Sequence, residues 1–307
     1  TRSLVVTGVQ TCALPILIAL SNQEKWRPWG AFALEAMVLV LAIWLFAPLQ
    51  ASLGWTGLIL TELAFLALAV GTALLHKTPL EEVFPLKRPT LRELGGVLLL
   101  NLSGLMLSIF ATHISLILLP QSTPEIKELY DFLYTGQSLP VMVLVVAIMP
   151  AICEETLQRG AILSHLRSLK KEWLIILIMG ILFGLFHLSA LRFLSTVILG
   201  ALLSYLMVKK NNLVLPMLMH LVNNLVSVMA GTMASENAGQ ALDTMQTITP
   251  LQRIGGGCIV CCLVPVLLVA AANLIDPTGH RRKSWLVAGL CSVALFAAGI
   301  VCASLSM

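Results

Sequence analysis

The stretch 148–160 contains the residues best suited to chemistry in this chain. It continues an apolar run that starts at Leu139, yet it holds the adjacent carboxylates Glu154 and Glu155 and the cation Arg159. A charged residue at the centre of a membrane helix costs roughly 2.5–3.5 kcal/mol, so such residues usually face a bundle interior and serve function. In a helix, Glu155 and Arg159 lie four residues apart on one face and can pair. Glu154 points about 100° away, which leaves it free for chemistry.

Two later apolar segments each contribute a histidine. His187 follows Phe183 by four residues, and His220 and Asn224 are four apart on one face of a predicted helix. One such histidine is more often a packing residue, but two of them with two glutamates and an asparagine favour a site. At 1.5 Å per residue, Glu154 lies ~14 Å from the basic end of its segment, His220 ~12 Å and His187 ~20 Å. We expect these groups to meet in the cytoplasmic half, with the helix of His187 tilted or starting later.

These groups fit the hydrolysis of an amide by an activated water. A glutamate removed from bulk water is a good general base, and a nearby histidine can hold the water or shuttle a proton. A second histidine and an Asn amide can stabilise an oxyanion. Glu154, His187 and His220 are also a His₂Glu set of the kind that binds catalytic zinc, so the pattern leaves both mechanisms open. The sequence contains no HExxH, which excludes the ordinary zincin arrangement, and no GxSxG-type nucleophile site.

The composition indicates a polytopic helical membrane protein. The chain is 58% hydrophobic and 11% charged, with a mean hydropathy of +0.93, whereas soluble domains carry about 25% charged residues. No basic stretch with interleaved aromatics lies outside the apolar segments, so nucleic-acid binding is not supported. We predict an all-α bundle of eight to nine spans, since most segments approach the ~20 residues that cross a bilayer and one is short. The segments are 31–49, 57–76, 94–119, 139–163, 173–190, 193–208, 213–231, 255–274 and 285–306.

Every second connection between these segments is basic. The positive-inside rule then places the N-terminus in the cytoplasm and, after nine crossings, the C-terminus outside. The basic residues are Lys25, Arg27, Lys77, Lys87, Arg88, Arg92, Arg167, Lys170, Lys171, Lys209, Lys210, Arg281, Arg282 and Lys283. Pro124 favours a short interfacial helix over 124–134. Gly200 and Ser204 form a small-xxx-small pair that lets two helices approach closely.

The first sixteen residues are excluded from reasoning about the fold. Residues 6–16 resemble the translation of a common sequencing-adapter oligonucleotide, and the chain lacks an initiator Met. We expect residues 1–16 to be an assembly artefact, with N-terminal transmembrane helices over 17–138, a catalytic core over 139–231 and a C-terminal helix pair over 232–307. The seven cysteines do not form a disulfide framework, and the CxxC at Cys258 and Cys261 lacks a second ligand pair.

Three short polar patterns occur in order over about 139–231. They are Glu154-Glu155-x-x-x-Arg159, Phe183-x-x-x-His187 and His220-x-x-x-Asn224. Together they resemble the three motifs of the CPBP family, which comprises CAAX-processing type II proteases, bacteriocin-processing or immunity proteins and bacterial relatives, also called the Abi family. The resemblance gives Glu155 and Arg159 the structural pairing that helix geometry also predicts.

The resemblance also implies roles for the other motif residues. Glu154 would activate the water with help from His187, while His220 and Asn224 would stabilise the oxyanion. The chain would be an intramembrane endopeptidase in a bacterial plasma membrane, acting on a peptide or protein substrate reached from the membrane or the cytoplasmic face. Many family members carry the label metalloprotease, and a divalent metal such as zinc, held by Glu154, His187 and His220, stays open.

The chain departs from the family pattern at one position. Gln158 stands where an aromatic residue, commonly Phe, precedes the motif arginine. We expect this change to affect packing near Arg159 or the substrate groove, and it weakens the case for a lipidated substrate more than the case for peptide hydrolysis. Two other functions stay open. A non-catalytic immunity or scaffold protein has no reason to bury the four polar motif residues, and a transporter predicts charges spread through the bilayer.

Overall fold

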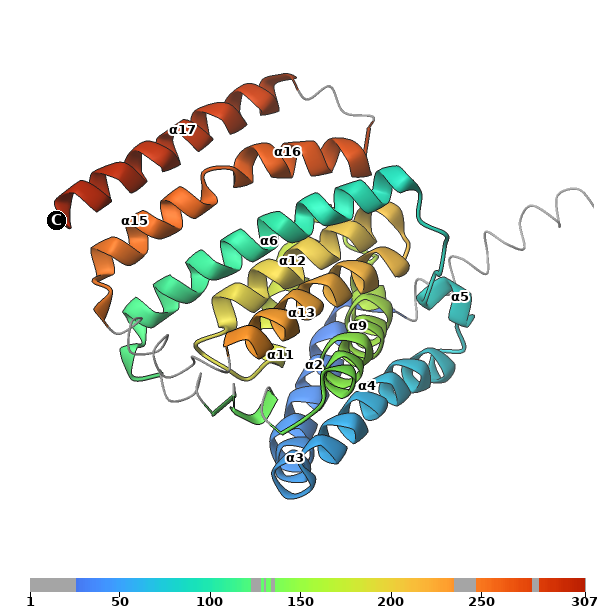
Figure 1. Cartoon of the computed structure of the whole chain (residues 1–307). Coiled ribbons are helices and arrows are strands. Elements are labelled where there is room, and N and C mark those ends of the chain that lie inside the picture. Colours follow the sequence, from blue (N-terminus) through green and yellow to red (C-terminus); the bar gives the residue numbers. More distant parts are fainter. Residues whose placement is uncertain are drawn as a thin grey trace, which may run out of the picture.

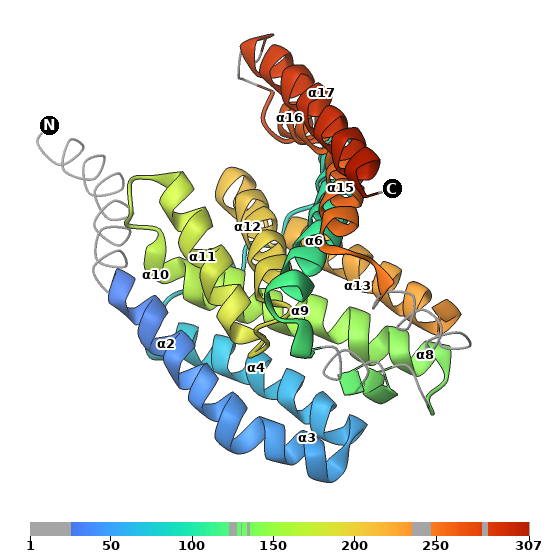
Figure 2. The ribbon, with the colours of Figure 1, turned by 90° about the vertical axis from the view of Figure 1, so that its left-hand side faces the viewer.

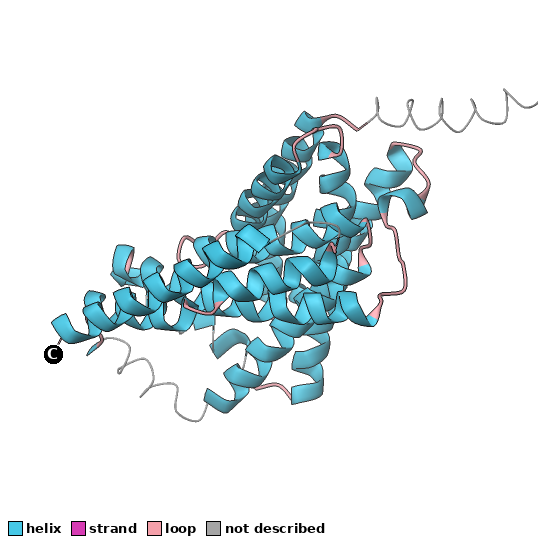
Figure 3. Cartoon of the chain, turned by 90° about the horizontal axis from the view of Figure 1, so that it is seen from above, coloured by secondary structure: helices cyan, strands magenta, loops and turns pink. Residues whose placement is uncertain are grey.

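In the computed structural model, the chain folds as a bundle of helices. The structure describes residues 26–122, 128–129, 131–133, 136–234, 247–277 and 282–306, and these contain no strand (Figure 3). Within these residues, eight helices are long and apolar enough to cross a membrane, and a further apolar helix, Glu172–Phe186, is shorter. This confirms the predicted polytopic all-α bundle. The expected artefact at 1–16 and most of the expected helix over 124–134 lie outside the described residues, and the cytoplasmic N-terminus stays a prediction.

Several of the long helices are composed of consecutive helical pieces. The bounds are α2 Pro28–Leu41, η1 Ala42–Phe46, α3 Ala47–Leu53, α4 Trp55–Leu75, α5 Leu80–Val83, α6 Leu91–Leu118, η2 Pro120–Ser122, α8 Leu139–Met142, η3 Val143–Ile148, α9 Met149–Glu155, η4 Thr156–Ile162, α10 Leu163–Leu166, α11 Glu172–Phe186, α12 Phe193–Lys210, α13 Val214–Ala234, α15 Pro250–Cys261, α16 Val264–Ile275 and α17 Arg282–Leu305. The run from α8 to α10 forms one continuous span.

The span that carries the two glutamates lies between two groups of helices. On one side, α4 packs against α9 and η4, with α2 and α3 beside it; on the other, α13 packs against η3 and α9. Figures 1 and 2 show α2 to α4 as one layer, α11 to α13 in the middle and α6 next to them. The hairpin formed by α15, α16 and α17 covers the outer side of α6. The glutamates are therefore at the centre of the bundle.

Two π-helical segments each precede a proline. The segment η1 ends two residues before Pro48, and η3 ends two residues before Pro150. A proline inside a helix has no N–H for the carbonyl four residues earlier, and its ring crowds that carbonyl. A wider π turn accommodates such a defect, and π turns occur often at functional sites. The irregular turn before Pro150 thus lies at the start of α9, the short helix that ends with the glutamate pair.

The helices α11 and α12 approach each other through glycine. A Cβ built on Gly200 would lie 2.6 Å from the Cβ of Phe183, a distance that real side chains do not tolerate. Ser204, one turn later, is fully buried and donates its hydroxyl hydrogen to the Gly200 carbonyl over 2.7 Å. The small-xxx-small pair therefore lies at a close helix contact, as predicted. This contact holds Phe183 near the polar residues of the span that runs from α8 to α10.

Candidate active site

The predicted pair of Glu155 and Arg159 is present in the centre of the bundle. Nη1 of Arg159 donates to Oε1 of Glu155 over 2.9 Å, and both side chains have 0% exposure. Nη2 of Arg159 donates to the carbonyl of Gly200 over 3.0 Å, and the guanidinium carbon lies 4.3 Å from the ring centroid of Phe183. Arginine suits this place because its planar group can form directed hydrogen bonds and stack on a ring at once. The pair joins η4 to α11 and α12.

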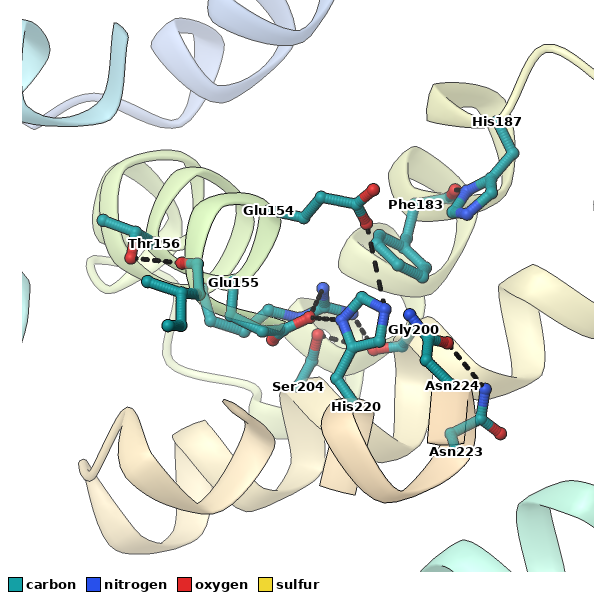
Figure 4. Close-up of polar contacts among 12 residues, drawn as sticks. Glu154, Glu155, Thr156, Phe183, His187, Gly200, Ser204, His220, Asn223 and Asn224 are labelled. Atoms are coloured by element: carbon teal, nitrogen blue, oxygen red, sulfur yellow. Dashed lines mark hydrogen bonds and ion pairs between the residues drawn. The ribbon is translucent and has the colours of Figure 1, made fainter. Parts of the chain in front are cut away.

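Glu155 also holds His220, which the sequence did not reveal. Nδ1 of His220, on α13, lies 2.8 Å from the same Oε1 that accepts from Arg159. An ionised carboxylate only accepts hydrogen bonds, so Nδ1 carries the hydrogen here. The opposite ring nitrogen, Nε2, therefore accepts in the neutral histidine and donates only in the imidazolium form. It faces Glu154, at 4.0 Å from Oε2, which is longer than a hydrogen bond (Figure 4).

Glu154 lies at the wall of a cavity of about 740 Å³. The side chain is nearly buried, with 9% exposure, and its Oε2 has no hydrogen-bond partner. His187, His220 and Asn224 line the same cavity. Figure 4 shows Glu154 reaching from its helix toward the space between His187 and His220. The structure thus brings the four motif residues of the sequence analysis together around one space.

His187 lies just beyond the end of its helix rather than inside it. The helix α11 ends at Phe186, and His187 is its C-cap residue. Nδ1 of His187 donates to the carbonyl of Phe183 over 2.9 Å, because a carbonyl can only accept. Nε2 of the neutral ring is then an acceptor. The expectation of a helix that starts later is wrong: α11 starts at Glu172 and is only ~22 Å long, and it ends before reaching the histidine.

Asn224 supports the helix that carries the glutamates. Its Nδ2 donates to the carbonyl of Val146 over 3.0 Å, and its Oδ1 accepts from Nδ2 of Asn223 over 3.3 Å. Val146 is four residues before Pro150. In an ordinary helix its carbonyl would accept a hydrogen bond from the N–H of residue 150, which proline lacks. Asn224 therefore satisfies a carbonyl that Pro150 cannot. One of its two amide hydrogens is used in this way, which leaves the second for another acceptor.

The cavity includes charged residues that the sequence analysis passed over. Glu62 of α4 and Arg192, the N-cap of α12, both line it. A signal for Glu62 was present, because it is a lone charge within an apolar segment. Gln158 is fully buried and its Nε2 donates to Oε2 of Glu35 over 2.9 Å. Gln158, the polar residue where the family has an aromatic one, thus contacts an acidic side chain of α2. Its expected effect on packing therefore concerns the contact between α2 and η4.

The residues proposed for zinc do not form a metal site in this geometry. Within the part of the chain that the structure describes, no three His, Cys, Asp or Glu side chains lie together closely enough to hold a metal ion. Catalytic zinc needs three protein ligands at about 2.0–2.2 Å. A water molecule between Glu154 and the histidines fits a looser arrangement.

The central part of the chain matches the model of a known protein family. Residues 136–226 match the model of a family described as type II CAAX prenyl endopeptidase, Rce1-like. The searches of curated proteins and of solved structures gave no match. The matched range contains Glu154, His187, His220 and Asn224 and nearly coincides with the range of the three motifs. The resemblance to the CAAX protease family is confirmed for residues 136–226, and the eight long apolar helices among the described residues indicate an integral membrane protein.

Proposed function

We propose that this protein is an intramembrane endopeptidase in which Glu154 activates a water molecule to hydrolyse a peptide bond. The observation that carries the proposal is the setting of Glu154. Its Oε2 is buried without a hydrogen-bond partner, and it lies at a cavity that His187, His220 and Asn224 also line. A carboxylate with no partner in the protein is costly, by about 1–3 kcal/mol or more. It is explained if a water molecule and a substrate complete its surroundings.

The proposed mechanism assigns one task to each group. Glu154 takes a proton from the water, which attacks the carbonyl carbon of the substrate. Nε2 of His187 accepts a hydrogen bond and helps to hold this water. Nε2 of His220, when protonated, and the second amide hydrogen of Asn224 donate to the oxyanion that develops. In the resting protein, a water molecule would lie between these groups.

Glu155 and Arg159 act through His220 in this proposal. The hydrogen bond from Nδ1 of His220 to Glu155 fixes the ring and its tautomer, as a carboxylate does for a catalytic histidine in other hydrolases. Arg159 in turn neutralises Glu155. The adjacent carboxylates of α9 thus have different tasks, since Glu154 serves the reaction and Glu155 serves the position of His220.

The proposed substrate is a peptide or protein segment that enters the cavity from the membrane or from the cytoplasmic face of a bacterial plasma membrane. Much of the cavity wall is apolar, with Leu58, Leu105, Ile109, Leu116 and Phe132 among its residues. Such a wall accepts apolar side chains or a lipid chain by removing them from water. The description of the matched family makes a prenylated C-terminal peptide the first candidate to try.

The test is cleavage of a defined peptide by the purified full-length protein in detergent. Two fluorogenic peptides of one sequence are compared, one with a farnesylated cysteine near the C-terminus and one without the lipid. We expect Glu154→Gln to abolish cleavage while the melting temperature stays close to that of the wild type. Glu35→Gln is the control, because Glu35 is also buried but does not line the cavity. Full activity of Glu154→Gln would contradict the proposal.

A further inference from the structure

The carboxyl group of Glu62 is buried at the cavity without a protein partner. The side chain has 3% exposure and its Oε2 makes no hydrogen bond. In the described part of the chain, the structure gives Glu62 neither a hydrogen bond nor an ion pair. A group of this kind lowers stability by about 1–3 kcal/mol or more. Packing therefore does not explain it, but contact with the contents of the cavity does.

Glu62 and Glu154 come from different helices to the same space. Glu62 belongs to α4 and Glu154 to α9, and these helices pack against each other. Both residues line the same cavity. Two carboxylates that share a site with little water do not both ionise, so one of them holds a proton. When Glu154 is ionised as the base, Glu62 is the partner that carries this proton.

Peptide hydrolysis needs two proton transfers, and the proposed function assigns only one of them. A proton must leave the water, and a proton must reach the amine that departs. We propose that Glu62 is a catalytic residue that donates the proton to the leaving nitrogen. This inference rests on the proposed function, in which Glu154 removes the first proton.

The atoms and protons balance in this scheme. The water loses a proton to Glu154, and its oxygen forms a bond to the carbonyl carbon. The C–N bond then breaks with its electron pair going to nitrogen, which takes the proton of Glu62. After the products leave, Glu154 is protonated and Glu62 is an anion, and one proton passes between them through the water of the cavity. The net reaction is the addition of water to a peptide bond.

A second buried glutamate in the same layer provides a comparison. Glu35 of α2 has 1% exposure, accepts a hydrogen bond from Gln158 and is not part of the cavity wall. Its partner and its position give it a structural role in the contact between α2 and η4. Glu62, by contrast, has no hydrogen-bond partner for its Oε2 and is part of the cavity wall. Glutamine keeps the shape of each side chain but replaces the carboxyl group by an amide, which cannot act as a general acid.

The experiment compares two leaving groups. An alkoxide leaves without protonation far more readily than an amine, so loss of a general acid affects an ester less than an amide. The bond that the wild type cleaves is first mapped by mass spectrometry, and the same peptide is then made with an ester at this bond. We expect Glu62→Gln to lower kcat on the amide by about 10²–10⁴-fold and to change kcat on the ester by less than about tenfold. Glu62→Asp keeps an acid and should keep the wild-type ratio of the two rates.

Other outcomes separate this inference from the proposed function. Equal losses of Glu62→Gln on amide and ester, or no loss on the amide, would overturn the role of Glu62 and leave Glu154 untouched. Glu154→Gln should lose activity on both substrates, and full activity of this variant would overturn the proposed function itself. Glu35→Gln should match the wild type on both substrates. A melting temperature measured for each variant shows that the rates refer to folded protein.

Discussion

Replacing Arg159 by alanine tests whether the buried pair is structural. Arg159 has no exposed surface, donates to Glu155 and Gly200, and stacks on Phe183. Its removal leaves Glu155 as a buried charge whose remaining partner is His220. Breaking one side of a buried pair in this way costs about 3–5 kcal/mol. At about 2–4 °C for each kcal/mol in a large chain, the melting temperature should fall by roughly 6–20 °C.

The assay is thermal unfolding of purified variants in one detergent, arranged as a double-mutant cycle. Glu155→Gln alone removes the charge that Arg159 neutralises, and the combined variant removes both charges. We expect the combined variant to melt above Arg159→Ala, because the stranded carboxylate is gone. The ion pair of Lys209 with Glu172 is partly exposed, and Lys209→Ala should therefore cost less than about 1 kcal/mol.

Two results would refute this reasoning. An Arg159→Ala protein that melts within about 2 °C of the wild type would show that the pair is not needed for the fold. Additive losses from Arg159→Ala and Glu155→Gln would show that the two side chains do not stabilise each other, since coupled neighbours differ from additivity by about 0.5–3 kcal/mol.

Two further predictions concern the metal and the close helix contact. Treatment with a chelator, followed by metal analysis, should leave activity in place without stoichiometric zinc, because the proposed water needs no metal; zinc whose removal and return switch activity off and on would contradict this. Gly200→Ala should lower stability by about 1–3 kcal/mol, since its Cβ would lie 2.6 Å from the Cβ of Phe183, whereas Gly71→Ala, with nothing within 4 Å of the new Cβ, should be neutral or slightly stabilising. Equal melting temperatures for the two alanine variants would contradict the contact described at Gly200.

The sequence predicted the features that depend on composition and on short spacing. Apolar segments of about 20 residues predicted the membrane spans, and the four-residue spacing of Glu155 and Arg159 predicted their ion pair. It did not predict that Glu155 also binds His220, which is 65 residues away, because such a contact depends on how α9 and α13 cross. It also missed Glu62, since an acid in an apolar segment shows only that a partner is needed. The partner here is the cavity, which exists only after the helices pack.

The end of α11 was mispredicted for a related reason. The apolar pattern continues through Leu188 and Leu191, so the residues alone suggested a span to about 190. The structure ends the helix at Phe186 and turns the chain there, with Leu188 at a positive φ of 49°. Such a backbone conformation is uncommon for a residue with a side chain. The turn moves His187 off the helix and to the cavity, where its Nε2 is available.

The central span shows how one helix can supply both a reactive group and the framework around it. Glu155 faces the core with no exposure, and its Oε1 contacts both Arg159 and His220. Glu154, one position earlier, faces the cavity, where its Oε2 has no hydrogen-bond partner. The hydrogen bond to Glu155 fixes which nitrogen of His220 points to Glu154. Asn224 adds a second restraint by binding the carbonyl of Val146, four residues before Pro150. The same two residues of α13 that hold this helix in place therefore also face the space in which Glu154 would act.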